Sequence, residues 1–335
     1  MNNKSALVIT SISAPNSVLT AFAEQSRDHG VDFIVVGDVK SPLEFQLSGC
    51  DFWSIERQKT LEFKIAGIIP EGHYARKNLG YLVAMGRGVE VIIETDDDNQ
   101  PLASFWTERK AWQQSVLLEN GSWINVYRYF TDAMIWPRGF PLEYVQRPIP
   151  ALSEQKEQEL FCPIQQGLAN ANPDVDAIYR LTMPLPQSFS DTSTIVVGNG
   201  SWSPFNSQNT TWFKEAFPLL YIPSYCSFRM CDIWRSFVAL RICWANDWGV
   251  QFHGPTVYQE RNEHDLLKDF SDEVPGYLNN ARLCQELADL DILKGSDNTT
   301  SNMMKCYQAF IKLGLISSKE TKLLNAWFSD VSSTH

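Results

Sequence analysis

Three consecutive aspartates, Asp96, Asp97 and Asp98, directly follow an apolar run over residues 89–93. The density of valine and isoleucine in that run predicts a buried strand, and the polar cluster then marks its carboxyl end. Open α/β sheets bind their ligands at this end of the strands. Adjacent carboxylates repel one another, and hard oxygen ligands suit Mg²⁺ or Mn²⁺, whose coordination substrate phosphates can complete. A solvated acidic turn explains an isolated triplet equally well, so the choice between a metal site and a turn depends on the neighbouring segments.

Two further strands are predicted upstream of the triplet, over residues 6–12 and 32–37. Apolar residues at helical spacing fill the interval between them, and a His-Gly pair ends the pattern. Two strands joined by such a helix form a βαβ unit and hence a parallel sheet. Asp38 follows the second strand, where nucleotide-binding folds often place a carboxylate against the base or ribose. A plain turn aspartate fits that position equally well.

Residues 74–87 predict a helix that leads into the strand before the triplet. Arg76, Lys77 and Asn78 cluster near its start. A helix N-terminus that carries cations is well placed to bind a pyrophosphate. A solvated first turn is the alternative, and the adjacent acidic strand end favours binding.

Beyond the triplet the pattern is less regular. Residues 105–118 have the periodicity of a helix, whereas residues 121–150 are rich in proline and aromatic side chains. The latter stretch suits the wall of a cleft or an irregular subdomain packed on the sheet. Three cations in it could meet an anion, although each alone is more often a surface residue: Arg128, Arg138 and Arg147.

The second half contains one more candidate for chemistry. Residues 205–212 combine amides, hydroxyls and aromatic rings, a combination that suits a sugar but also an ordinary polar loop. Residues 230–248 predict a strong helix with Asp232 at its start, where an aspartate is also a good N-cap. A last strand is expected over 249–258, and the chain reads as helical from 265 onward.

Composition limits the classes of function. The chain has 335 residues and a net charge of −11, which argues against nucleic acid or an anionic membrane surface as the main partner. Its seven scattered cysteines fit reduced thiols better than a disulfide framework or a zinc site. Neither a signal peptide nor a transmembrane run is visible. We therefore expect a soluble cytoplasmic protein, with peripheral attachment to the inner face of a membrane left open.

Taken in order, several segments resemble glycosyltransferases of the GT-A fold, more narrowly the STELLO family, and more distantly the reversibly glycosylated polypeptides, which are UDP-arabinopyranose mutases. The segments that carry this resemblance are ARKNLGYLVAMGRGVEVIIETDDDN (75–99), WPRGFPL (136–142), DVDAIYRL (174–181), FNSQNTTWF (205–213), CDIWRSFVALRICW (231–244) and GPTVYQERN (254–262). The resemblance implies a Rossmann-type, mostly parallel sheet flanked by helices. It also implies a catalytic domain over 1–265, with a nucleotide-binding half over 1–100 and an acceptor-side half over 101–265. A helical extension follows over 266–335.

The resemblance also implies roles for individual residues. The triplet matches a DxD-type motif, in which Asp96 and Asp98 hold a divalent metal, Mn²⁺ or Mg²⁺, on the diphosphate of a nucleotide sugar while Asp96 and Asp97 contact the nucleotide. The other implied contacts to the nucleotide sugar are Thr10, Asp38, Arg76, Lys77, Asn78 and Asn209.

Asp232 matches the acidic position of the mutases' DDMW motif. In an inverting transferase it would be the general base that deprotonates the acceptor hydroxyl, helped by a pKa raised through partial burial. The mutases carry a histidine just after the last strand, as a candidate third metal ligand, where this chain has Tyr258 and Gln259. His253 and His264 lie nearby at shifted positions, and either is a candidate, although a lone histidine is more often structural.

The leading hypothesis is a metal-dependent transferase that moves a sugar, from a UDP-sugar by resemblance, to a glycan, a polysaccharide unit or a small hydroxylated acceptor. A sugar-nucleotide mutase would use the same pocket with a small closed acceptor side. A non-catalytic scaffold of the same fold is the third hypothesis, and the retained acidic residues argue against it. A nucleotidyltransferase ranks last, because the loop after the first strand is neither glycine-rich nor basic. Aromatic residues in the C-terminal half leave room for a homodimer.

Overall fold

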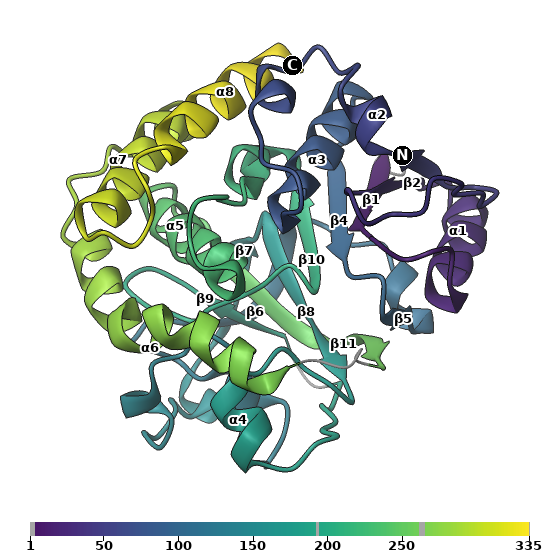
Figure 1. Ribbon diagram of the computed structural model, residues 1–335. Helices are drawn as coiled ribbons and strands as arrows, with labels where there is room; N and C mark the ends of the chain where they lie inside the picture. The colour runs from purple at the N-terminus through teal and green to yellow at the C-terminus, as the bar shows by residue number, and fades with distance from the viewer. Residues whose placement is uncertain (1–3, 192–193, 261–264, 335) are drawn as a thin grey trace.

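A single sheet of eleven strands runs through the computed structural model, which describes residues 4–191, 194–260 and 265–334 (Figure 1). The strand order is β3-β2-β1-β4-β10-β8-β11-β9-β6-β7, and β5 pairs with β11. The strands are β1 (Ser5–Thr10), β2 (Asp32–Val36), β3 (Asp51–Trp53), β4 (Val91–Thr95), β5 (Asn99–Pro101), β6 (Trp112–Leu118), β7 (Glu157–Phe161), β8 (Ile164–Asn170), β9 (Ile195–Val197), β10 (Asn209–Phe213) and β11 (Val250–Gln259). The α-helices are α1 (Ser17–His29), α2 (Ile55–Gln58), α3 (Lys77–Gly86), α4 (Ala177–Thr182), α5 (Cys231–Ala245), α6 (Leu266–Ala288), α7 (Thr299–Lys312) and α8 (Glu320–Ser333).

The first four strands of this order form a parallel sheet, as the sequence predicts. Strand β1 pairs in parallel with both β2 and β4. Its side chains alternate between two cores, because Leu7 packs in the cluster that contains the buried face of α1 whereas Val8 packs in the cluster that contains α3. Gly80 allows α3 to lie close to the sheet, since a Cβ there would come within 2.6 Å of Val36 and 2.7 Å of Val8.

The second half of the sheet is mixed. Strand β10 is antiparallel to both β4 and β8, and β8 then runs parallel to β11. The helix predicted over 105–118 is wrong: a short 3₁₀ turn, η3 (Ala103–Trp106), is followed by β6. Both edges of β6 are paired, with β7 on one side and β9 on the other, and this pairing overrides the helical spacing of its apolar residues.

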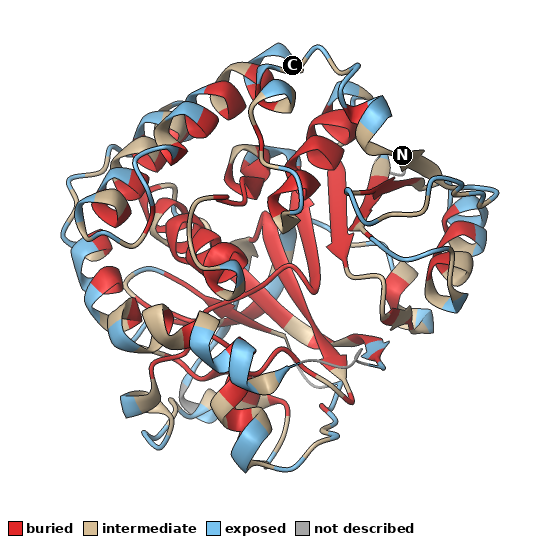
Figure 2. Cartoon of the chain, in the orientation of Figure 1, coloured by how far each residue is buried: buried red, intermediate tan, exposed pale blue. Residues whose placement is uncertain are grey.

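Helix α5 is almost entirely buried and packs against α6 and α7, whereas α8 packs against α7 and α3 (Figure 2). Helices α6, α7 and α8 each have one buried and one exposed face. Two buried carboxylates attach α8 to earlier loops. Asp330 accepts hydrogen bonds from the backbone N–H groups of Lys64 and Ile65, at 2.8 Å each. Glu320 accepts them from Ser224 and Tyr225. Buried hydrogen bonds thus connect the predicted helical extension to residues 64–65 and 224–225 of the predicted catalytic domain.

Candidate functional site

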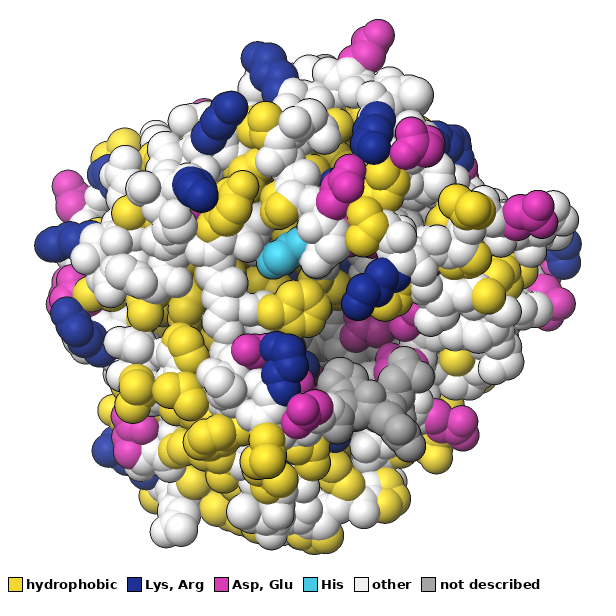
Figure 3. Space-filling model, viewed as in Figure 1, with side chains coloured by type: hydrophobic (Ala, Val, Ile, Leu, Met, Phe, Trp, Pro, Cys, Tyr) yellow, Lys and Arg dark blue, Asp and Glu magenta, His cyan; other side chains and the backbone are white. Residues whose placement is uncertain are grey.

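A cleft of about 880 Å³ opens at the carboxyl ends of β1, β2 and β4. Figure 3 shows it as a hollow with acidic side chains in its depth and basic and hydrophobic side chains at its rim. Its lining comes from residues 10–13, 36–40, 72–74, the aspartate triplet, residues 207–208, the segment around residues 228–232 and the start of α6. Parallel strand ends and later segments thus meet in one place, as expected for an α/β ligand site.

The triplet forms the turn between β4 and β5, and all three aspartates line the cleft. Ser11 donates a hydrogen bond of 2.5 Å to the carboxylate of Asp97, and Gln259 at the end of β11 donates one of 3.0 Å to Asp98. Asp96 accepts one of 3.1 Å from the hydroxyl of Tyr74. Each carboxylate is therefore oriented by a different element.

The carboxylates of Asp96 and Asp98 fit a hard divalent cation by their chemistry. Within the described ranges, no group of three or more His, Cys, Asp or Glu side chains is arranged as a complete metal site. Mg²⁺ needs only one or two carboxylates when phosphates and water supply the other oxygens, so a two-carboxylate site suits a metal that arrives with a diphosphate. Burial raises the pKa of Asp96 to about 7 against the opposing effect of Lys77, and the carboxylates of Asp98 and Asp97 raise it further. A nearby cation would relieve that cost of ionisation.

The raised pKa of Asp96 predicts a pH dependence of stability. In the unfolded chain the pKa of an aspartate is roughly 3.9. Between about pH 4 and pH 7, Asp96 is therefore protonated to a greater extent in the folded protein than in the unfolded chain. Stability contributed by this group must then fall as the pH rises through that window. We expect the melting temperature of metal-free protein, measured in EDTA, to fall less steeply with pH in Asp96→Asn than in the wild type. Asp132→Asn, at an exposed position, is the control, and equal slopes in all three proteins would contradict the prediction.

Asp232 lies on the wall formed by the start of α5, where a buried arginine binds it. Arg138 donates to both carboxylate oxygens at 3.0 and 2.9 Å, and it binds Asp174 in the same bidentate way at 2.8 Å. Burial alone would raise the pKa of Asp232, but the guanidinium of Arg138 outweighs it and holds the pKa well below its usual range. The expected rise of this pKa is therefore wrong. The N-cap alternative is not borne out either, because α5 begins at Cys231 and its N-cap position is Met230.

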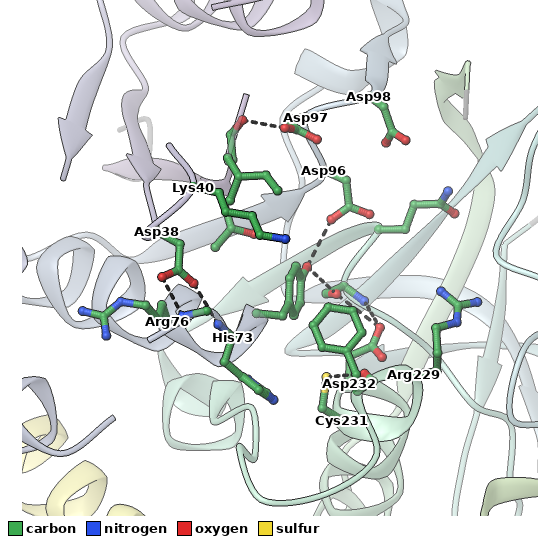
Figure 4. A pocket seen from close by; sticks show the side chains of 18 of the residues that line it. Asp38, Lys40, His73, Arg76, Asp96, Asp97, Asp98, Arg229, Cys231 and Asp232 are labelled. Atoms are coloured by element: carbon green, nitrogen blue, oxygen red, sulfur yellow. Dashed lines mark hydrogen bonds between the residues drawn. The ribbon is translucent and has the colours of Figure 1, made fainter. Parts of the chain in front are cut away.

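A chain of hydrogen bonds links the triplet to Asp232 (Figure 4). The hydroxyl of Tyr74 lies 3.1 Å from Asp96 and 2.7 Å from the hydroxyl of Ser207. Ser207 in turn donates to Asp232 through its backbone N–H, and its hydroxyl oxygen lies at the same distance of 3.2 Å from that carboxylate. Lys77 completes the cluster by donating to Tyr74 at 2.8 Å. The two acidic groups of the cleft are thus held at a fixed separation by side chains between them.

Beneath the triplet, a second ion pair fixes β4 to α5. Arg235 donates to both oxygens of Glu94, at 3.1 and 2.7 Å, and both side chains are essentially inaccessible to solvent. Tyr81 and Trp212 also donate to Glu94. Because Glu94 lies two residues before Asp96 and Arg235 follows Asp232 by less than one turn, this network fixes the relative position of the two acidic groups.

The remaining predicted nucleotide-sugar residues divide into two groups. Thr10, Asp38 and Arg76 line the cleft. Asp38 accepts hydrogen bonds from the backbone of Gly72 and His73, at 2.8 Å each, and so holds the turn before α3. Arg76 donates to Gln58 at 2.7 Å and is only 3% exposed.

The other group is buried and lies outside the lining. Lys77 donates to the backbone of Thr95 beside its contact with Tyr74, and Asn78 exchanges two hydrogen bonds with the backbone of Ile222. Asn209 donates to Leu168 and Thr256, whereas its neighbours Ser207 and Gln208 do line the cleft. These three side chains support the walls of the cleft.

Of the two histidines proposed as metal ligands, the described structure places His253, and it lies away from the cleft lining. His253 lies within β11, outside the lining, where its Nδ1 contacts the carbonyl of Gly254 at 2.9 Å. Burial lowers its pKa to about 3, and Arg109 lowers it further. His264 lies outside the described residues.

Sequence reasoning missed four features of the cleft: Tyr74, Lys40, the Arg138–Asp174 pair and one face of α6. Lys40 follows β2 and points into the cleft (Figure 4). Arg138 and Asp174 belong to the segments WPRGFPL and DVDAIYRL, so their membership of the same ordered set of motifs was the available signal. An isolated arginine gave no indication that it is buried between two carboxylates.

Comparison with known proteins gives matches along most of the chain. The model of a family described as STELLO glycosyltransferases matches residues 229–335. Two relatives from Arabidopsis thaliana are named "Probable glycosyltransferase STELLO2", 27% identical over 331 residues, and "Probable glycosyltransferase STELLO1", 26% identical over 324 residues. Each alignment covers 90% of this chain but only 41% of the relative, so the chain spans about two fifths of their length. The predicted resemblance to STELLO glycosyltransferases is confirmed over that region.

A solved structure described as the crystal structure of a mycobacterial protein aligns with a TM-score of 0.40 and 10% identity, over 83% of this chain and 74% of the other. That likeness is too distant to assign a fold or a function. Among the described residues, no helix has both the length and the apolar character needed to span a membrane.

Proposed function

We propose that this chain is a glycosyltransferase that moves a sugar from a nucleotide-sugar donor, taken as a UDP-sugar, to a hydroxyl group of an acceptor. One observation carries the proposal: the triplet and Asp232 face the same cleft and are joined through Tyr74 and Ser207. A transferase needs groups for the leaving diphosphate at one end of its site and for the attacking hydroxyl at the other. The similarity to STELLO glycosyltransferases supports the same class.

Asp96 and Asp98 would hold a divalent cation, which supplies Lewis-acid stabilisation of the leaving diphosphate. Lys40 extends toward the same space and would add a positive charge near the phosphates. Thr10 and the backbone of residues 36–40 would contact the nucleoside, since they form the wall at the ends of β1 and β2.

Asp232 would accept the hydrogen bond of the acceptor hydroxyl and orient its oxygen. Because Arg138 keeps this carboxylate ionised, it is a weak base toward a free hydroxyl. The hydroxyl becomes acidic only as its oxygen bonds to the anomeric carbon, and the proton would pass to Asp232 at that stage. Direct attack of this kind inverts the anomeric configuration.

The mutase alternative requires a closed pocket that admits only the nucleotide sugar. A cleft of about 880 Å³ that extends to α6 favours a transferase, because it leaves room for a separate acceptor. The scaffold alternative offers no reason for buried carboxylates to be oriented toward a common space.

Thermal-shift measurements with nucleotides and NDP-sugars, with and without Mn²⁺, test the proposal. A ligand that binds only the folded state stabilises it by about 2.7 kcal/mol at a concentration 100 times its Kd. We expect a nucleotide diphosphate or its sugar to raise the melting temperature in Mn²⁺ and to do so much less in EDTA. If no nucleotide raises the melting temperature under either condition, the transferase proposal fails and a scaffold role becomes the better explanation.

A further inference from the structure

One face of α6 forms a wall of the cleft, although this helix follows the region predicted as catalytic. The cleft residues on it are its N-cap Asp265 together with Lys268, Asp269 and Asp272, at the spacing that places side chains on one side of a helix. The residues proposed to bind the donor are the triplet and those at the ends of β1 and β2, which form other parts of the lining. The α6 wall is therefore free to contact the acceptor.

Phe228 supplies an exposed aromatic surface next to that wall. Its side chain lines the cleft and is 51% exposed, which is unusual for a large apolar residue in a site otherwise rich in charge. Its ring packs at a steep angle against those of His73 and Tyr74, with centroid distances of 5.7 and 6.3 Å. These contacts hold its orientation while one part of the ring stays open to the cleft.

The segment that carries Phe228 is tied both to α6 and to Asp232. Ser227 donates a hydrogen bond to the backbone carbonyl of Asp272, and the backbone carbonyl of Arg229 accepts one from Arg138, the residue that binds Asp232. The aromatic ring and the α6 face therefore adjoin the carboxylate that would orient an acceptor.

Among the described residues, three cations beside Phe228 and the α6 face are engaged by carboxylates: Lys268, Arg229 and Arg138. Arg229 lies 2.9 Å from Glu273 and 3.8 Å from Asp269, and Lys268 lies 2.5 Å from Asp272. Arg138 is bound by two aspartates, as described above. An anionic acceptor would have to displace one of these pairs or approach the carboxylates of Asp265, Asp269 and Asp272 on the α6 face, and like-charge contacts of this kind are unfavourable.

We infer that Phe228 and the α6 face form the acceptor subsite, and that this subsite takes an uncharged, hydroxyl-rich carbohydrate. Carboxylates accept hydrogen bonds from neighbouring sugar hydroxyls, and a flat ring packs against the C–H face of a pyranose. The inference rests on the proposed function, since it concerns the acceptor of that reaction.

Saturation-transfer NMR with matched pairs of methyl glycosides tests the inference, with and without UDP and Mn²⁺. Each pair consists of a neutral pyranoside (gluco, galacto or manno) and the corresponding uronate. We expect at least one neutral glycoside to bind and its uronate to bind several-fold more weakly. Phe228→Ala should weaken the neutral glycoside by roughly 2- to 10-fold, because an aromatic contact of this kind is worth about 0.5–1.5 kcal/mol, whereas Phe228→Trp should retain binding. Asp272→Asn removes one carboxylate from the wall and should therefore reduce the difference in affinity between the neutral glycoside and its uronate.

Equal or tighter binding of the uronate, unchanged binding in Phe228→Ala, or binding of no glycoside by the wild type would each overturn the inference. The nucleotide-dependent thermal shift in Mn²⁺ is measured in the same variants and should be unchanged in Phe228→Ala. Glycoside binding without any nucleotide response would contradict the transferase proposal while leaving the carbohydrate subsite in place. A nucleotide-dependent thermal shift without glycoside binding would contradict the carbohydrate subsite and leave the transferase proposal in place.

Discussion

Glu94→Ala is expected to lower the free energy of unfolding by about 3–5 kcal/mol, the cost of leaving one member of a buried ion pair without its partner. Arg235 is 1% exposed and would keep its charge among Trp212, Tyr81 and the apolar residues of α5. Urea denaturation measures the effect as a lower midpoint at an unchanged slope.

Glu90→Ala is the matched control, because Glu90 forms an ion pair with Lys214 at 3.4 Å in which both side chains are about half exposed. Exposed pairs contribute at most about 1 kcal/mol, so we expect a small change there. The double variant Glu94→Leu with Arg235→Leu should recover a large part of the lost stability, since apolar residues of similar volume often replace a buried pair without penalty. A loss of less than about 1 kcal/mol in Glu94→Ala would show that the ion pair does not fix β4 to α5.

Asp98→Ala is expected to remove the metal-dependent stabilisation by nucleotide and to reduce sugar transfer by at least about 100-fold, the size typical of losing a group that stabilises charge in the transition state. The side chain lies at the turn and not in the core, so the variant should fold. Binding of Mn²⁺ in the presence of nucleotide, followed by electron paramagnetic resonance of the free ion, measures the loss independently of activity.

Asp132→Ala changes an exposed aspartate elsewhere in the chain and should leave Mn²⁺ binding unaltered. If Asp98→Ala binds Mn²⁺ and nucleotide as tightly as the wild type, the cation does not bind at the triplet. Its role in the proposed reaction would then have to be assigned to other side chains.

The parallel half of the fold could be predicted from local patterns. Val8, Ile34 and Ile93 stand in dense β-branched runs, and the helices between the strands carry clear apolar spacing and end signals, so each element was predicted by its own residues. The α/β class and the resemblance to STELLO glycosyltransferases are both confirmed. Strand β6 was not predictable in this way, because it depends on partners contributed by β7 and β9 much later in the chain.

The chemistry of the site was predictable in type but less so in detail. The triplet and Asp232 do meet in the cleft, because strand ends and helix starts converge there. The pKa direction of Asp232 was wrong because burial was visible in the sequence whereas the opposing Arg138, far away in the chain, was not. Lys77 was expected to bind the nucleotide from a helix start, whereas in the structure it is buried and donates to Tyr74 and Thr95. The pKa of Asp232 and the direction of Lys77 both depend on contacts between segments distant in the sequence, and local sequence patterns do not predict such contacts.

The order of the strands also determines when the site can form during synthesis. Strand β4 ends immediately before the triplet, but its second neighbour, β10, begins only at Asn209, and Arg235 is made later still. A chain that emerges from the ribosome amino end first therefore presents β4 with one bare edge, and Glu94 without two of its partners, for the time needed to make the whole middle of the protein. Exposed edges are sites of misassociation, and the charge of Glu94 on that edge would discourage pairing with another chain until Trp212 and Arg235 arrive.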